Sequence, residues 1–146
     1  MKKEGAVFHA DRTGLAKLLG SLEAELMEVV WSTAPPVTAR DVHERATAEV
    51  KYVTVVTVLN NLWRKGLLSR ERDGRAFQYR ATSTREEFVR AASEGVFRGL
   101  LDLSPRIAVN SFVGVLDALS LDQIEELRAE VARHLKARED DPDATE

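Results

Sequence analysis

One side of the segment 53–65 carries side chains that could read the edges of DNA bases. On a helical wheel of 100° per residue, this side lies opposite a narrow apolar stripe. Asparagine can pair with adenine, arginine with guanine, and apolar groups can contact the thymine methyl. The candidate base-reading residues are Thr57, Asn60, Asn61, Arg64, Val53 and Val56. The same pattern also fits an ordinary solvated helix face, and the two valines also fit local packing.

A second group of basic and hydroxyl residues could contact DNA phosphates. Such contacts fix the register of a protein on the duplex and make its affinity dependent on salt. The candidates are Lys51, Thr54, Lys65, Arg72, Arg75 and Arg80, with Arg70 equally suitable. Thr38 could add a contact at a helix N-terminus, although we expect its hydroxyl mainly to cap that helix.

These side chains need a helix and a hairpin to position them. Val55, Val58, Leu59 and Leu62 fall within about 100° on the wheel, so the period predicts a helix over 53–65. The β-branched run that opens the segment would also permit a strand. Alternating segments 67–72 and 76–80 flank an Asp-Gly pair at 73–74, which predicts a tight hairpin. In its second strand, two aromatic residues should share one face and Gln78 and Arg80 the other.

Two shorter helices are predicted before this segment. Ser21 is a candidate cap for a helix over 22–31, which the Ala34-Pro35-Pro36 run should follow. Thr38 and Asp41 form a near relative of the capping box and should open a helix over 39–48. A helix-turn-helix followed by a basic hairpin is a winged helix, a fold that holds duplex DNA. We place this domain at 18–82 and expect 1–17 to be a flexible extension.

The segment 83–137 has the character of a helical dimerisation region. Capping boxes at 84–87 and 120–123 and the Ser104-Pro105 pair predict three helices. Their apolar stripes are small for a separate core of about 55 residues, and domains of that size are marginal alone. Burial against an identical chain would complete them. The candidate interface residues are Phe112, Val113, Leu116, Ile124, Leu127 and Val131. The acidic segment 138–146 is expected to be disordered.

The fold class expected is therefore mainly α with a small β-wing, with a winged helix-turn-helix domain and a C-terminal helical dimerisation region. The charge follows this division. Residues 1–82 hold 13 basic and 10 acidic residues and the remainder 8 and 14, which accounts for the total of −3. Residues 51–80 alone hold 7 basic and 2 acidic residues. Such asymmetry suggests a polyanion-binding part joined to another element.

Several classes of function are excluded or disfavoured by the composition. The chain has no cysteine, which excludes disulfides and thiolate chemistry. Its three scattered histidines show no ligand spacing, and no triad or phosphate loop is visible, so we expect neither enzyme activity nor a metal or cofactor. No signal peptide or apolar run of spanning length is visible, and we expect a soluble cytoplasmic protein without membrane insertion.

Four motifs in order resemble the BlaI/MecI/CopY winged-helix repressors, with the BlaI/MecI branch the better match. The segment 19–23 with Met27 and Trp31 resembles their opening helix, and the segment 54–59 with Leu62 and 64–66 resembles their recognition helix. The segment 73–79 is similar to their wing, and 124–128 to their last helix. The resemblance covers about residues 18–137.

The resemblance implies a homodimeric repressor that binds dyad-symmetric operators of β-lactam-response or copper-export genes. It also implies a membrane sensor-protease as partner, which in the β-lactam branch cleaves between asparagine and phenylalanine. Here the candidate cleavage residues are Ser111 and Phe112, and the asparagine stands one place earlier, at Asn110. The cysteine-rich C-terminus of the copper branch is absent.

Two other functions remain open. One is a ligand-responsive winged-helix regulator of another regulon, although no convergent polar set defines a ligand pocket. The other is a winged-helix protein-interaction module, whose wing would be uncharged. The four arginines of this wing favour the DNA-binding alternative.

Overall fold

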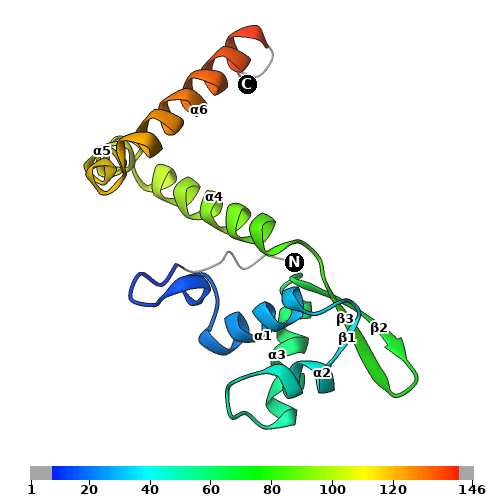
Figure 1. Cartoon of the computed structure of the whole chain (residues 1–146). Helices are drawn as coiled ribbons and strands as arrows, with labels where there is room; N and C mark the ends of the chain where they lie inside the picture. The colour runs from blue at the N-terminus through cyan, green and yellow to red at the C-terminus, as the bar shows by residue number, and fades with distance from the viewer. Residues whose placement is uncertain (1–7, 142–146) are drawn as a thin grey trace. The chain divides into compact units, whose positions relative to one another are not determined.

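The computed structural model describes residues 8–141 and shows a helical chain with one small antiparallel sheet (Figure 1). This confirms the expected fold class. Its elements in chain order are η1 (Gly14–Lys17), α1 (Ser21–Ser32), β1 (Val37–Thr38), α2 (Ala39–Arg45), α3 (Tyr52–Arg64), β2 (Leu68–Asp73), β3 (Ala76–Ala81), α4 (Arg85–Leu103), α5 (Pro105–Gly114), η2 (Leu116–Ala118) and α6 (Leu121–Asp140).

The sheet has the strand order β1-β3-β2, and β1 was not predicted. It contains only two residues, too few to show an alternating pattern, and it pairs Val37 with Tyr79. The hairpin loop lies one residue later than expected, because Asp73 pairs with Ala76 and leaves Gly74 and Arg75 as the loop. Gly74 has φ +62°. A glycine with positive φ at the first loop position is the pattern of a type II′ turn, which matches the twist of the strands.

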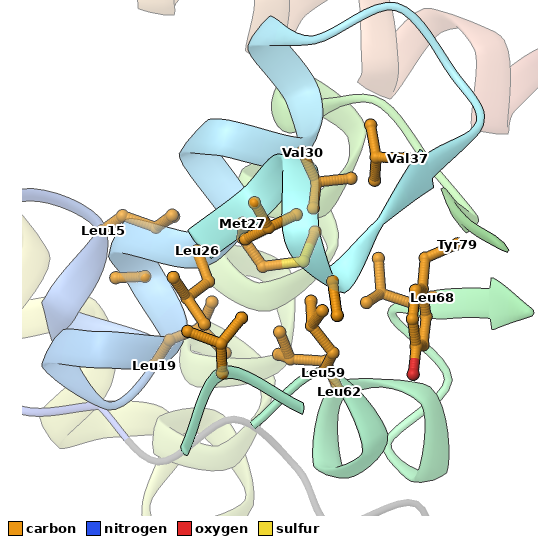
Figure 2. Close-up of a cluster of buried hydrophobic side chains, with 14 of the residues drawn as sticks. Leu15, Leu19, Leu26, Met27, Val30, Val37, Leu59, Leu62, Leu68 and Tyr79 are labelled. Atoms are coloured by element: carbon orange, nitrogen blue, oxygen red, sulfur yellow. The ribbon is translucent and has the colours of Figure 1, made fainter. Parts of the chain in front are cut away.

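The core of the N-terminal unit lies between α1, α2, α3 and the inner face of the sheet (Figure 2). The stripe predicted on α3 is buried at Val55, Leu59 and Leu62, while Val58 is only partly covered. Tyr79 from β3 is 1% exposed and completes this core. The stripe therefore fixes which side of α3 faces solvent.

The helix starts follow capping chemistry, with one difference from expectation. Thr38 caps α2 as predicted, since its hydroxyl accepts from the Asp41 amide at 3.2 Å and its amide donates to the Asp41 carboxylate at 2.8 Å. The hydrogen bond from the Thr38 amide, followed by one that the Thr38 hydroxyl donates to the same carboxylate at 2.8 Å, holds the pKa of Asp41 below its usual value. At α1 the cap is Gly20, not Ser21, because the Gly20 amide donates to the Glu23 carboxylate at 3.1 Å.

The domain core begins earlier in the chain than we expected. Instead of a flexible extension through residue 17, Gly14–Lys17 forms a 3₁₀ turn, and Leu15 is buried beside Leu18 and Leu19. Three apolar residues within five positions give this turn a face that packs on α1. The first seven residues of the expected extension lie outside the described residues.

Internal contacts divide the chain into two units, one ending at Gly99 and the other beginning at Leu100. The expected boundary at 82/83 therefore lies too early. The Trp31 indole donates to the Ser83 carbonyl at 2.9 Å, and the Trp31 ring packs on Phe88 at 5.7 Å. Arg85 also pairs with Glu28 at 2.8 Å, so the start of α4 belongs to the N-terminal unit.

The C-terminal unit contains α5, η2 and α6 and leaves large apolar side chains exposed. Leu121 is 81% exposed, and Ile107, Val113 and Val131 are each about half exposed or more. The expected stripe on the middle helix ends before Leu116, because α5 stops at Gly114 and Leu116 belongs to η2. The expectation of disorder from residue 138 is wrong for the residues up to Asp140, which belong to α6, and residues 142–146 lie outside the described residues.

Candidate nucleic-acid interface

The solvent-facing side of α3 presents a row of three side chains, in which Thr57 lies one turn after Val53 and Arg64 lies two turns after Thr57. Val53 is 72% exposed, and Thr57 and Arg64 are also exposed. The Thr57 hydroxyl donates to the Val53 carbonyl at 2.9 Å, so its oxygen retains acceptor capacity. Arg64 donates to the Asn61 side chain at 3.3 Å. This row has the residue types and the exposure that major-groove readout requires.

Asn60 does not belong to this row. Its side-chain oxygen accepts from Arg70 at 2.6 Å and from the Tyr79 hydroxyl at 3.1 Å. Burial raises the pKa of the Tyr79 hydroxyl above its ordinary value, and Arg70 partly offsets that shift. Asn60 therefore joins α3 to the wing, and its bidentate pairing with adenine is not available in this arrangement.

Arg70 is likewise held inside the domain. Its guanidinium lies 3.6 Å from the centre of the Trp63 ring and 4.2 Å from that of Phe77. Both distances are within the range of a cation–π contact, so the guanidinium interacts with two aromatic rings. Arg70 was a candidate for phosphate contact, but its guanidinium lies in the junction between α3 and the wing.

A groove of about 820 Å³ separates the starts of α2 and α3 from the wing. Arg40 lies on its α2 side, Tyr52 and Val56 on its α3 side, and Arg75 on its wing side. Tyr52 is 49% exposed and contacts the His43 ring edge-on. Neither Arg40 nor Tyr52 was predicted from the sequence, although their positions at helix starts beside a basic wing were an available signal.

The other candidates for phosphate contact divide between three places. Lys51 and Thr54 are exposed at the start of α3, and Arg72 lies near the wing tip with its Nε donating to the Gly74 carbonyl. Lys65 lies at the opposite end of α3, paired with Glu23 at 2.7 Å.

Arg80 lies on the other face of the wing. In the register it opposes Ser69, whereas Arg70 and Arg72 oppose Tyr79 and Phe77. Opposed residues in an antiparallel pair share one face, which confirms the predicted faces of the second strand.

Glu25 fixes the turn between α2 and α3, a role that the sequence analysis missed. One of its carboxylate oxygens accepts from the Thr47 amide at 2.6 Å, the Thr47 hydroxyl at 2.9 Å and the Ala48 amide at 2.8 Å. The hydrogen bond from Ala48, followed by those from Thr47, holds the pKa of Glu25 below its usual value. The two amides bond to Glu25 instead of extending α2, which therefore ends at Arg45 rather than at the expected residue 48.

The described residues were compared with the requirements of a metal site and of a membrane span. Within residues 8–141, no three acidic or histidine side chains gather in a way that could hold a metal ion. Among the helices of the same range, none is both long enough and apolar enough to cross a membrane.

The chain is similar in sequence to several known proteins. The chain is 34% identical over 122 residues to the transcriptional regulator BlaI of Mycobacterium tuberculosis, in two strains, covering 81% of this chain and 87% of that protein. It is 27% identical over 117 residues to an uncharacterized 16.5 kDa protein of Latilactobacillus sakei, covering 79% and 77%.

Among solved structures, MepR, a transcription regulator of a Staphylococcus aureus efflux pump, covers 81% of this chain and 78% of its own at 19% identity. Its TM-score of 0.36 is too low to support a conclusion about function. A sequence model of the penicillinase repressor family matches residues 19–133. The chain therefore belongs to the penicillinase repressor family, as a DNA-binding transcriptional repressor and not an enzyme.

Proposed function

We propose that the chain binds dyad-symmetric operator DNA as a homodimer and represses transcription by occupying promoter DNA. One observation carries this proposal: α3 exposes the row of Val53, Thr57 and Arg64, and the start of the same helix lines a groove with an arginine on its α2 side and another on its wing side. A helix row of this kind fits a major groove, and the flanking cations fit the phosphate backbone beside it.

The proposed reading set is smaller than the one expected from the sequence. Arg64, Thr57 and Val53 contact bases, and Asn61 orients Arg64 through their hydrogen bond. Val56 is half-buried and lines the groove, where it meets sugar rather than base. The backbone set comprises Lys51, Thr54, Arg72 and Arg75 from the sequence analysis together with Arg40 and Tyr52.

The proposed dimer interface is formed by the C-terminal unit. Val113 and Val131 leave about half of their surface in solvent, and Ile124 and Leu127 are only partly covered. Exposed apolar side chains on both helices of this unit indicate an interaction site. A two-fold axis through this interface would place two copies of α3 in major grooves about one helical turn apart, or a multiple of that distance.

The regulated genes and the inducing signal are proposed from the identity to BlaI. We propose a β-lactam-response or related operon, with inactivation by a membrane sensor-protease that cleaves near Ser111 and Phe112. Both residues lie inside α5, so cleavage there requires that turn of the helix to unwind. Mass spectrometry of the chain from host cells treated with a β-lactam tests this step: a cut within α5 supports it, and an intact chain during induction contradicts it.

DNA binding is tested on duplexes selected from random sequence by the purified protein. Fluorescence anisotropy should show salt-dependent binding that favours the selected duplex over a scrambled one. Arg64→Ala should weaken binding to the selected duplex by about 1–3 kcal/mol and leave the scrambled duplex nearly unaffected. Arg80→Ala, on the opposite wing face, is the matched control. Equal losses of affinity for both duplexes would show that Arg64 contacts phosphate and not bases. Absence of binding by the unchanged protein in dilute buffer would refute the proposal.

A further inference from the structure

Three aromatic residues and two polar ones join α3 to both strands of the wing. Trp63 and Asn60 come from α3, Arg70 from β2, and Phe77 and Tyr79 from β3. We call these five residues the wing clamp. Arg70 is its centre, because its guanidinium contacts both ring faces and donates to Asn60.

We propose that Arg70 is a positioning residue for DNA binding, which sets the distance between α3 and the wing through the wing clamp rather than by touching DNA. The inference rests on the proposed function in one respect, that α3 and the wing bind the same duplex. The role assigned to Arg70 is separate from that function, because this cation of the wing changes the affinity for DNA through contacts inside the protein.

The chemistry of the contacts supports a fixed geometry. A guanidinium is planar, so it can stack between two rings and donate in its own plane at the same time. The Asn60 side-chain oxygen accepts hydrogen bonds from the Arg70 guanidinium at 2.6 Å and from the buried Tyr79 hydroxyl at 3.1 Å. Because Arg70 lies on β2 and Tyr79 on β3, both strands orient the Asn60 side chain. A lysine ammonium is a compact, strongly hydrated charge and cannot reproduce the stack and the in-plane bond together.

The wing clamp lies between α3 and the part of the hairpin that carries the arginines proposed to contact phosphate, so it can affect the affinity for DNA. Arg72 lies opposite Phe77 at the outer edge of the clamp, Arg75 lies in the loop beyond it, and residues 71–76 are exposed. β1 pairs with β3 only at Tyr79 and Gln78, and beyond these residues the hairpin is two-stranded. A two-stranded hairpin is marginally stable by itself, so its direction depends on what holds its base. Loss of Arg70 would leave both tip arginines intact but free to sample positions away from the phosphates.

The test compares Arg70→Lys with Arg80→Lys, the same change on the opposite face of the same strand pair. Arg70→Lys should weaken binding to the selected duplex about tenfold, the size expected when cation–π contacts with two rings are weakened together. Arg80→Lys should bind as the unchanged protein does. In the free protein, hydrogen exchange at the amides of 68–81 should accelerate in Arg70→Lys and remain unchanged in the control.

A second variant separates positioning from phosphate contact. Trp63→Leu removes one ring of the wing clamp and no charge, so it should weaken binding in the same direction, and the double variant should lose little more than either single one. It also provides the test if Arg70→Lys fails to fold. Normal affinity in Trp63→Leu, or weak binding of Arg70→Lys with unchanged wing exchange, would overturn the inference. Failure of the unchanged protein to bind any duplex would instead overturn the proposed function.

Discussion

Replacing Glu25 by glutamine should destabilise the N-terminal unit by about 1 kcal/mol at pH 7. One carboxylate oxygen accepts three hydrogen bonds from Thr47 and Ala48, at 2.6–2.9 Å. A net bond to a charged acceptor contributes about 1.5–3 kcal/mol in a shielded site. Here the three bonds share one acceptor and lie near solvent, which lowers their sum to about 2 kcal/mol. Glutamine retains a neutral acceptor oxygen, so about half of this stabilisation of the folded state should be lost.

The assay is thermal unfolding followed by circular dichroism across a pH series. A loss of about 1 kcal/mol lowers the midpoint of a domain of this size by about 4–8 °C. Glu49→Gln, an exposed carboxylate in the same loop, is the matched control and should leave the midpoint unchanged.

The pH dependence has a definite sign. The pKa of Glu25 is lowered in the folded state from 4.5, so the unfolded chain binds the proton more tightly. The stability that this carboxylate contributes is therefore complete above its unfolded pKa and is lost as the pH falls through the folded pKa. The difference between the unchanged protein and Glu25→Gln should shrink below about pH 4.5. Equal midpoints at pH 7, or a difference that stays constant into acid, would refute this role of Glu25.

Two further perturbations test the wing and the C-terminal unit. Gly74→Ala should destabilise the hairpin by about 1–2 kcal/mol because of the φ of +62°, since an added Cβ there meets nothing within 4 Å. Gly95→Ala, inside α4 and with equal space, should instead be neutral or stabilising. Equal midpoints of thermal unfolding for the two variants would contradict this expectation. Leu127→Asp should convert the proposed dimer to a monomer on a sizing column and weaken binding to the selected duplex, and a fully dimeric variant would exclude this residue from the interface.

The sequence was sufficient for elements whose signals are local. The period of Val55, Leu59 and Leu62 located the buried side of α3, and the Thr38–Asp41 spacing predicted the cap that is found. The alternating pattern around Gly74 predicted the wing to within one residue. In each case the residues that decide the structure lie within a few positions of one another.

The site could be predicted only in part, because its contacts join residues far apart in the chain. The helical wheel gives the angle of Asn60 on α3 but cannot show that β2 and β3 pack over it. Likewise, Arg70 differs from the other wing arginines only through two rings contributed by α3 and β3. Glu25 acts on residues more than twenty positions away, and no local motif marks such a bond.

Through the proposed dimer, the apolar side chains that α5 and α6 leave in water would link this repressor to its own abundance. A second chain would cover these side chains, so the stability of the unit would rise with the number of molecules per cell. Because two chains would have to meet, dilution during growth would lower the assembled fraction more steeply than the number of chains. Gene dosage and the rate of cell division would then help to set the threshold at which a promoter is released.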